Sequence, residues 1–346
     1  MAISKLRLTD FRNFKNKLIE FSPNTTVIVG PNASGKTNIL ESIYLVSTAK
    51  SFRARIEEEM INYQKELARV KAKTDQIHEV VLTRGEITLG TSKPERVARK
   101  RLLLNNVGKR LIDFVGNFRV VLFDPWDLDL VTQSPSLRRN FFDGILSQVD
   151  KEYRRASLSY EKGLRQRNKL LFRIREENLS KSQLLFWDRL LIKNGDYLSR
   201  KRQEFIDFAN LTQSLDNQKF HLEYDKSAIS EGRLEQYAQE EIAAATTLVG
   251  PHRDDFCFKE KDRELARFGS RGEQRMAVLW LKLAELLYIE KNTQDKPTLL
   301  LDDIISELDK AHRKIVVNTI KNRQTIITTT DSQYIKKFGK VEKIQL

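Results

Sequence analysis

A glycine-rich stretch near the start of the chain has the residue types and spacing of a phosphate-binding loop. Two glycines separated by four residues precede a lysine and a threonine, in the run Gly30, Pro31, Asn32, Ala33, Ser34, Gly35, Lys36, Thr37 and Asn38. Glycines let the backbone curl so that successive amide hydrogens point at phosphates, and the positive end of a following helix adds to the attraction. Lys36 is expected to reach the β and γ phosphates of ATP, and the Thr37 hydroxyl is expected to bind Mg²⁺.

Two adjacent carboxylates, Asp302 and Asp303, have the chemistry needed for the second half of such a site. They follow the apolar run Thr298 to Leu301, which predicts a buried strand. Because α/β sheets bind ligands at the carboxyl ends of their strands, this position suits a ligand site. Asp302 would hold Mg²⁺, usually through a water, and Asp303 would orient or deprotonate the water that attacks ATP. Lys36 and Asp303 are therefore the predicted catalytic residues.

A third motif lies between the other two in the sequence and precedes a predicted helix. Ser270 fits the cap of that helix, and Gly269 and Gly272 leave the backbone open to an anion. The run Ser270, Arg271, Gly272 and Glu273 is similar to the signature motif of ATP-binding-cassette proteins because of its position ahead of the acidic strand. Taken alone, the run is also compatible with a simple helix cap that has a glutamate in the first turn.

The periodicity of apolar residues predicts an α/β fold that is interrupted by a helical region. Strands are predicted at residues 3–11, 26–29, 101–106, 109–115, 118–123, 298–301 and 325–328, with a turn at Val107 and Gly108 between 101–106 and 109–115. Helices are predicted at 39–46, 270–290 and 310–321. Between 137 and 213, apolar residues recur every seven positions at Leu184, Leu191, Leu198 and Phe205, which predicts a helical hairpin. The expected organisation is a discontinuous ATPase head, 1–123 and 246–346, with a helical lobe at 124–245.

The charge of the chain is concentrated in two stretches. The formal net charge is +14; residues 93–110 contribute +6 and residues 151–213 contribute +7. Two separated basic stretches in an otherwise nearly neutral chain indicate a nucleic-acid partner, whereas either stretch alone is also compatible with a solvated helix face. A single cysteine, Cys257, and a charged start without a secretory apolar stretch predict the reducing cytoplasm.

The motifs occur in the order seen in RecF proteins, a bacterial family that acts on damaged or gapped DNA. The chain resembles this family in segments 8–14 (LTDFRNF), 30–43 (GPNASGKTNILESI), 120–131 (VVLFDPWDLDLV), 248–256 (LVGPHRDDF), 268–275 (FGSRGEQR) and 299–309 (LLLDDIISELD). The resemblance covers essentially the whole chain and implies an ATP-binding-cassette head of the SMC-like type. SMC proteins split the same head with a very long coiled coil, which this chain lacks.

The resemblance implies that two heads pair face to face around two ATP molecules. The signature of one chain, Ser270 with Gly272 and Glu273, would then cap the nucleotide held by the phosphate loop of the other. Neither half-site would be complete alone. ATP binding would close the dimer, and hydrolysis would reopen it.

Four further assignments come from the same resemblance. Arg12 and Asn13 match positions near the nucleotide in related heads. Residues Ser306 to Asp309 match the loop that crosses the dimer contact. Thr330 falls where transporter ATPases carry a switch histidine.

Two residues depart from the family pattern. Family members commonly have glutamate at the position of Trp126, and the glutamine that transporters place near this segment has no clear counterpart, which leaves magnesium contacts from this segment undecided. Asp303 stands where many cassette ATPases have glutamate. Its shorter side chain would hold the base farther from the attacking water, so slow hydrolysis is predicted.

The composition and the motifs together predict an ATP-controlled DNA-binding protein. The basic helical lobes and the basic stretch 93–110 of paired heads would hold duplex DNA, mainly through phosphate contacts that carry no sequence code. The resemblance to RecF further implies recombinational gap repair, a preference for duplex and single-strand junctions, RecR as a partner, RecO through RecR, and RecA loading as the outcome. The competing classes are a transporter ATPase, a nuclease-coupled ATPase and a structural SMC-like chromosome protein. They are disfavoured by the basic lobe, by the lack of a second carboxylate cluster and by the short hairpin.

One further motif has no role assigned by the nucleotide site. In the run Gly250 to Phe256, His252, Asp254 and Asp255 lie close together and suggest a metal or hydrolytic site. Successive residues do not converge readily on one metal, so this alternative is disfavoured. We expect the motif to shape either the head or its interface, and the sequence does not decide which.

Overall fold

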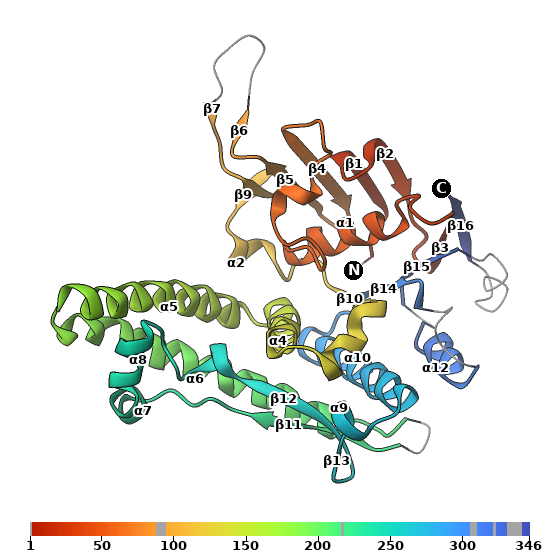
Figure 1. Cartoon of the computed structure of the whole chain (residues 1–346). Helices are drawn as coiled ribbons and strands as arrows, with labels where there is room; N and C mark the ends of the chain where they lie inside the picture. The colour runs from red at the N-terminus through yellow and green to blue at the C-terminus, as the bar shows by residue number, and fades with distance from the viewer. Residues whose placement is uncertain (1, 88–94, 216–217, 305–309, 321–322, 331–340) are drawn as a thin grey trace. The chain divides into compact units, whose positions relative to one another are not determined.

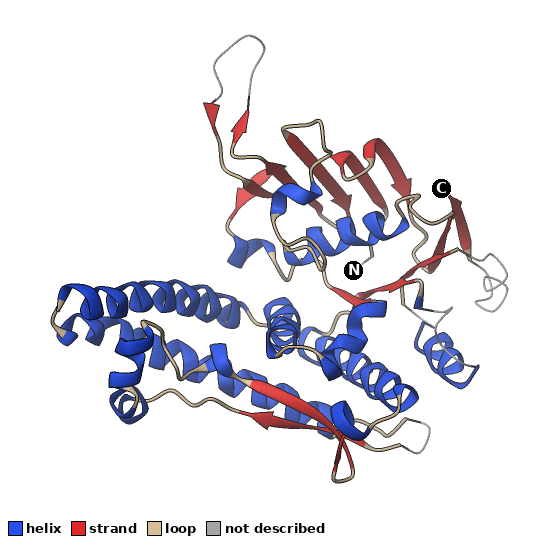
Figure 2. Cartoon of the chain, in the orientation of Figure 1, coloured by secondary structure: helices blue, strands red, loops and turns tan. Residues whose placement is uncertain are grey.

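The computed structural model describes residues 2–87, 95–215, 218–304, 310–320, 323–330 and 341–346. The chain divides into two compact units, which are drawn in Figure 1 and coloured by secondary structure in Figure 2. The first unit comprises residues 1–127 and 289–346, and the second comprises residues 128–288. The described part of the chain contains no helix long and apolar enough to cross a membrane.

The first unit contains an antiparallel sheet of six strands in the order β2-β1-β4-β5-β8-β9. The strands are β1 (Lys5–Phe11), β2 (Phe14–Glu20), β4 (Leu67–Lys73), β5 (Ile77–Thr83), β8 (Lys100–Leu104) and β9 (Val107–Lys109). In β1, Leu6 and Leu8 are buried whereas Lys5 and Arg7 are exposed. This alternation is the one expected of a strand with a single buried face, and it confirms the strand predicted near the N-terminus.

The second sheet of this unit has five parallel strands in the order β10-β14-β15-β3-β16. They are β3 (Thr25–Val29), β10 (Val120–Phe123), β14 (Thr298–Asp302), β15 (Thr325–Thr329) and β16 (Glu342–Gln345). Every residue of β3, β10, β14 and β15 is buried, as expected for parallel strands covered on both faces. Helix α1 (Lys36–Thr48) contributes Ile39 and Ile43 to the same core as Leu300 of β14.

Short elements complete the first unit. They are η1 (Glu57–Met60), β6 (Glu86–Ile87), β7 (Glu95–Arg96), α2 (Leu111–Phe114), η2 (Pro125–Leu128), whose last residue belongs to the second unit, and α12 (Lys310–Ile320). The strand predicted at 109–115 is wrong, because Leu111–Phe114 form helix α2. The turn before it lies at Asn105 and Asn106, with φ of 51° and 64°, rather than at the Val-Gly pair. Asparagine tolerates this left-handed backbone better than valine does.

The second unit is built on an antiparallel pair of long helices, α5 (Lys151–Glu177) and α6 (Leu185–Asn210). Leu184, Leu191, Leu198 and Phe205 are all buried, in agreement with the predicted hairpin. A side chain at Gly163 would approach Leu190 Cδ2 to 2.6 Å, so this glycine permits the close contact of the two helices.

The remaining elements of this unit include a three-stranded sheet that periodicity did not predict. The helices are α3 (Asp129–Thr132), α4 (Pro135–Val149), η3 (Lys181–Leu184), α7 (Glu231–Gln236), α8 (Ala238–Ala244), η4 (Pro251–Arg253), α9 (Leu265–Phe268) and α10 (Arg271–Thr293), whose end from Ile289 belongs to the first unit. The strands are β11 (Phe220–Asp225), β12 (Asp255–Glu260) and β13 (Arg263–Glu264).

The compact units differ in extent from the division expected from the sequence. Residues 246–288, expected in the head, lie in the second unit. Strand β12 pairs with β11, and the α10 ring of Tyr288 lies 5.1 Å from Phe205 and 5.2 Å from Phe208 of α6. These contacts are long-range in sequence, which is why local periodicity did not indicate them.

The Gly250 to Phe256 motif organises a polar interior within the second unit. Asp254 is fully buried and accepts hydrogen bonds from Arg202 Nη1 at 3.0 Å, from the Ser227 amide at 2.8 Å and from the Tyr224 hydroxyl. His252 Nε2 lies 2.9 Å from the Thr247 carbonyl. The motif therefore shapes the interior of this unit, and no cluster of three metal-ligating side chains occurs among the described residues.

Part of the positive charge of the second unit is internal. Arg167, on α5, is 2% exposed and forms ion pairs with Asp188 at 2.6 Å and with Glu241 at 2.7 Å. Arg202, on α6, is 3% exposed and pairs with Asp143 and Asp254. These two arginines do not belong to the basic surface that the sequence suggested for residues 151–213.

Candidate nucleotide-binding site

The glycine-rich loop connects the buried strand β3 to the start of α1. Gly35 has a φ of 102°, and a Cβ at this position would lie 2.6 Å from Phe14 Cζ and 2.8 Å from the Asn13 side chain. Only glycine fits this backbone and this space. Lys36 Nζ donates to the carbonyl oxygens of Gly30 at 2.8 Å and Pro31 at 2.9 Å, so its charge is held over the loop.

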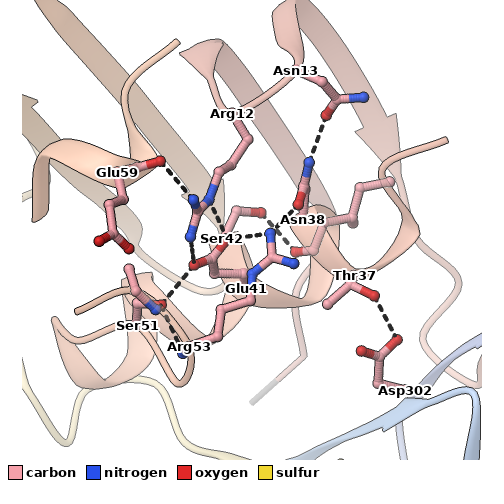
Figure 3. A network of polar contacts seen from close by, with 12 residues as sticks. Arg12, Asn13, Thr37, Asn38, Glu41, Ser42, Ser51, Arg53, Glu59 and Asp302 are labelled. Carbon is pink, nitrogen blue, oxygen red and sulfur yellow. Dashed lines mark hydrogen bonds and ion pairs between the residues drawn. The ribbon is translucent and has the colours of Figure 1, made fainter. Parts of the chain in front are cut away.

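The loop lies beside the acidic end of β14. Thr37 Oγ1 donates to Asp302 Oδ1 across 3.1 Å (Figure 3). Thr328, at the end of the neighbouring strand β15, also donates to Asp302 Oδ1, at 2.6 Å. The Asp303 amide donates to Thr328 Oγ1 at 3.1 Å, and Asp303 has a φ of 49°. Thr328 thus braces both carboxylate-bearing residues, a role that the sequence did not reveal.

The oxygen donors of this site fit a magnesium ion. Mg²⁺ prefers hard oxygen ligands, usually one or two protein oxygens with waters and phosphates. Thr37 supplies a hydroxyl oxygen, and Asp302, which is 6% exposed, supplies carboxylate oxygens. Both face the same cavity.

That cavity has a volume of about 420 Å³ and is contained within the first unit. It is lined by Asn32, Ala33, Gly35, Lys36, Thr37, Asn38, Phe52, Arg53, Asp124, Pro125, Trp126, Asp302 and Asp303. Trp126 is 73% exposed. The structure thus brings together the loop, both predicted carboxylates and the segment that departs from the family pattern.

A second cavity, of about 550 Å³, shares Asn38 and Arg53 with the first. Arg12 and Asn13 line it, so the structure places both residues next to the phosphate loop. Asn38 Nδ2 donates to Asn13 Oδ1 at 2.7 Å, and Asn13 Nδ2 donates to the Ser34 carbonyl at 3.3 Å. Ser34 belongs to the phosphate loop itself.

Two residues of this region, Glu41 and Arg53, were not predicted. Glu41 is fully buried on α1, and its carboxylate accepts hydrogen bonds from Arg12, Arg53 and Ser51 (Figure 3). Burial alone would raise the pKa of Glu41, but the hydrogen bonds from Arg12, Arg53 and Ser51 outweigh it, so its pKa lies below the ordinary value. The sequence feature that could have indicated Glu41 is a glutamate on the apolar face of a predicted helix.

The signature motif lies in the second unit, at the start of α10. Ser270 Oγ accepts from the Glu273 amide at 3.3 Å, and Glu273 Oε2 accepts from the Ser270 amide at 2.7 Å, which is a capping box. Arg263 also donates to Glu273, at 3.0 Å. Ser270 and Gly272 are exposed, and a Cβ on Gly272 would meet only Ser270 Oγ, at 3.9 Å.

The remaining positions that the sequence singled out are Thr330, residues 306–309 and Trp126. Thr330 follows β15 and is exposed. Residues 306–309 lie outside the described part of the chain. The amide of Trp126 donates to Asp124 Oδ1 at 2.7 Å, so this segment turns back on itself at the cavity wall.

The parallel sheet, the phosphate loop and the acidic strand end define a phosphate-loop ATPase head of the SMC-like, ATP-binding-cassette type. The sequence matches the model of the RecF/RecN/SMC N terminal domain over residues 2–346. It is 37% identical to the DNA replication and repair protein RecF of Lachnoclostridium phytofermentans, over 95% of this chain and 93% of that protein. It is also 37% identical to the protein of that name from Herpetosiphon aurantiacus, over 96% of this chain and 94% of that protein. The chain belongs to the RecF family.

Solved structures agree with this assignment. The recombination mediator protein RecF with ATP matches with a TM-score of 0.86 and 29% identity, over 95% of this chain and 92% of that chain. The Smc head domain derived from Pyrococcus furiosus matches with a TM-score of 0.50 at 19% identity, which reflects the shared fold. The predicted α/β head of the SMC-like type is therefore confirmed.

Proposed function

We propose that this chain is an ATP-controlled DNA-binding protein of recombinational repair, and a slow ATPase whose hydrolysis serves as a switch. The observation that carries the proposal is the approach of Thr37 to Asp302 at the cavity formed by the phosphate loop. The relatives are named DNA replication and repair protein RecF, and a similar solved structure is that of RecF with ATP.

In the proposed site, residues 30–38 hold the triphosphate, and Arg12 and Asn13 border the second cavity next to it. Lys36 turns from its loop carbonyls to the β and γ phosphates. Thr37 and Asp302 hold Mg²⁺, which when bound neutralises phosphate charge. Asp303 orients the attacking water and accepts its proton, with a short side chain that makes hydrolysis slow.

The exposed signature supports pairing of two chains. Ser270 and Gly272 lie at an open helix start, where amide hydrogens and the helix dipole attract anions. In the proposed dimer this turn, with Glu273, caps the γ phosphate held by the partner. Thr330 is assigned to the switch position.

DNA contacts are assigned to exposed basic residues. Lys162, Arg165 and Lys169 are exposed on α5 at spacings that place them on one side of the helix, and Arg101 and Lys109 are exposed on the β8–β9 hairpin. Such residues contact phosphates and make affinity depend on salt rather than on sequence.

The wider role is proposed from the family. The protein acts in the bacterial cytoplasm, on duplex DNA near single-strand gaps, during repair, recombination and replication and in the SOS response. RecR is the proposed partner, RecO joins through RecR, and RecA loading is the outcome.

The proposal is tested by measuring the affinity for a labelled duplex with a single-stranded overhang, with and without ATP and Mg²⁺, at several salt concentrations. ATP is expected to raise the affinity, and Lys36→Met is expected to remove this increase. The exposed Lys343 provides a control, since Lys343→Met leaves the loop intact. Equal affinity with and without nucleotide in the unaltered protein would contradict the proposal.

A further inference from the structure

Glu41 is a fully buried carboxylate that makes four hydrogen bonds to three side chains. Arg12 binds it through two nitrogens, with Nε to Oε2 at 2.8 Å and Nη2 to Oε1 at 2.6 Å. Ser51 Oγ donates to Oε1 at 2.6 Å, and Arg53 Nη2 donates to Oε2 at 3.0 Å. Figure 3 shows that Arg12, from the turn between β1 and β2, and Ser51 and Arg53, from the segment after α1, converge on Glu41.

The charges in this cluster do not cancel. One carboxylate faces two guanidinium groups, so the cluster keeps a net positive charge of about one unit at neutral pH, because arginine stays protonated. Arg53 lines both cavities, and Arg12 lines the second. Arg53 therefore faces the cavity assigned to the nucleotide, and Arg12 faces the cavity next to it.

The cluster is also connected to the phosphate loop. Arg53 Nη2 donates to Asn38 Oδ1, Asn38 donates to Asn13, and Asn13 donates to the Ser34 carbonyl. Arg12 Nη1 donates to the Glu59 carbonyl at 2.6 Å, which ties the segment after α1 to the β1–β2 turn. A shift of Arg53 would be transmitted to the loop through Asn38 and Asn13.

We propose that Glu41 is a positioning residue of the nucleotide site, which holds Arg12 and Arg53 toward the two cavities without itself touching the ligand. This inference rests on the proposed function, because it assumes that ATP occupies the phosphate-loop cavity. Charge-assisted, bidentate hydrogen bonds fix a guanidinium group in direction as well as in place. Without the carboxylate, the two like charges repel each other and the arginines lose their common orientation.

The test is a double-mutant cycle on ATP affinity, measured by calorimetry in Mg²⁺ on the full chain. Glu41→Gln keeps the shape of the side chain but removes its charge, and we expect ATP to bind at least about tenfold more weakly. Arg53→Gln alone is expected to weaken ATP binding as well. If Glu41 acts through Arg53, adding Arg53→Gln to Glu41→Gln weakens binding by much less than it does alone.

The melting temperature of each variant separates positioning from folding. Additive effects of Glu41→Gln and Arg53→Gln on ATP affinity would show that Glu41 does not act through Arg53 and would overturn the inference. Glu20→Gln is the control, because Glu20 is 61% exposed in a surface pair with Lys5 and should retain full affinity.

A conservative variant keeps the inference testable if Glu41→Gln does not fold. Glu41→Asp keeps the negative charge, so it is expected to fold. Its side chain is one methylene shorter and holds the carboxylate farther from the arginines, so we expect it to bind ATP more weakly than the unaltered protein. Unaltered ATP affinity in Glu41→Asp, or in a folded Glu41→Gln, would overturn the positioning role. Lys36→Met distinguishes failure of this inference from failure of the proposed function. If Lys36→Met and the Glu41 variants all bind ATP normally, the proposed function fails. If Lys36→Met binds ATP weakly while the Glu41 variants bind it normally, only the role of Glu41 is refuted.

Discussion

Thr37 and Asp302 are 265 residues apart in the chain, and the Thr37 hydroxyl donates to the Asp302 carboxylate across 3.1 Å. Thr37 lies in the first turn of α1, and Asp302 ends β14. The contact brings together the two halves of a head that is interrupted in sequence by the second unit. It gives the site two oxygen ligands suited to magnesium.

Replacing Asp302 by asparagine should separate magnesium binding from nucleotide binding. Asparagine keeps the shape and one acceptor oxygen but removes the charge that attracts Mg²⁺. We expect ATP affinity in EDTA to stay unchanged and the gain in affinity on adding Mg²⁺ to be lost, as measured by titration with MgCl₂. Asp75→Asn, at an exposed turn, is the control. A normal magnesium response in Asp302→Asn would show that the carboxylate has another role.

Removing exposed charge from α5 should change the salt dependence of DNA binding. Arg165→Gln combined with Lys169→Gln is expected to reduce the slope of log affinity against log salt by about 2, because each lost phosphate contact removes about 0.9. ATP binding should not change. The matched pair Lys5→Gln and Lys73→Gln, exposed in the first unit, should leave the slope as it is. An unchanged slope in the α5 variant would exclude this helix from the DNA contact.

The buried arginine of α5 should matter for folding. Arg167→Met leaves the fully buried Glu241 without its ion pair, and we expect the free energy of unfolding to fall by about 3 to 5 kcal/mol. Adding Glu241→Leu should recover part of this loss. Arg165→Met, two positions away and exposed, should cost less than about 0.5 kcal/mol in urea unfolding. A small effect of Arg167→Met would mean that Glu241 finds another partner or water.

Acid sensitivity of the first unit should depend on His78. Burial between Phe114 and Phe118 lowers the pKa of His78 to about 4 from 6.5. The unfolded chain therefore binds the proton more readily, so stability is fully present above pH 6.5 and falls by up to roughly 3 kcal/mol as the pH approaches 4. His78→Phe should flatten this part of the stability curve, whereas His221→Gln should not. An unchanged curve would mean that His78 is not the cause.

The sequence predicted the site of the first unit better than the organisation of the second. The phosphate loop and the Asp302 strand depend on local patterns, namely glycine spacing and an apolar run that ends in carboxylates. The sequence did not indicate roles for Thr328 and Glu41. The role of Thr328 arises from the pairing of β15 with β14, and that of Glu41 from the burial of α1.

The second unit depends on contacts between distant segments. The β11–β12 pairing joins residues 220–225 to 255–260, and no local period marks it. Net charge likewise could not distinguish Arg167, which is internal, from Arg165, which is exposed. The strand pairing and the burial of Arg167 both depend on contacts between residues that are distant in the sequence, so they become visible only in the folded structure.

The proposal that two chains complete each other's nucleotide site through Ser270 is tested most directly by the molecular mass in solution with and without ATP and Mg²⁺. We predict that ATP converts the unaltered protein to a dimer, and that Ser270→Arg still binds ATP but stays a single chain. Ser230→Arg is the control, because it alters another exposed helix cap of the same unit and should still pair. A Ser270→Arg protein that dimerises with ATP as readily as the unaltered protein would contradict the account.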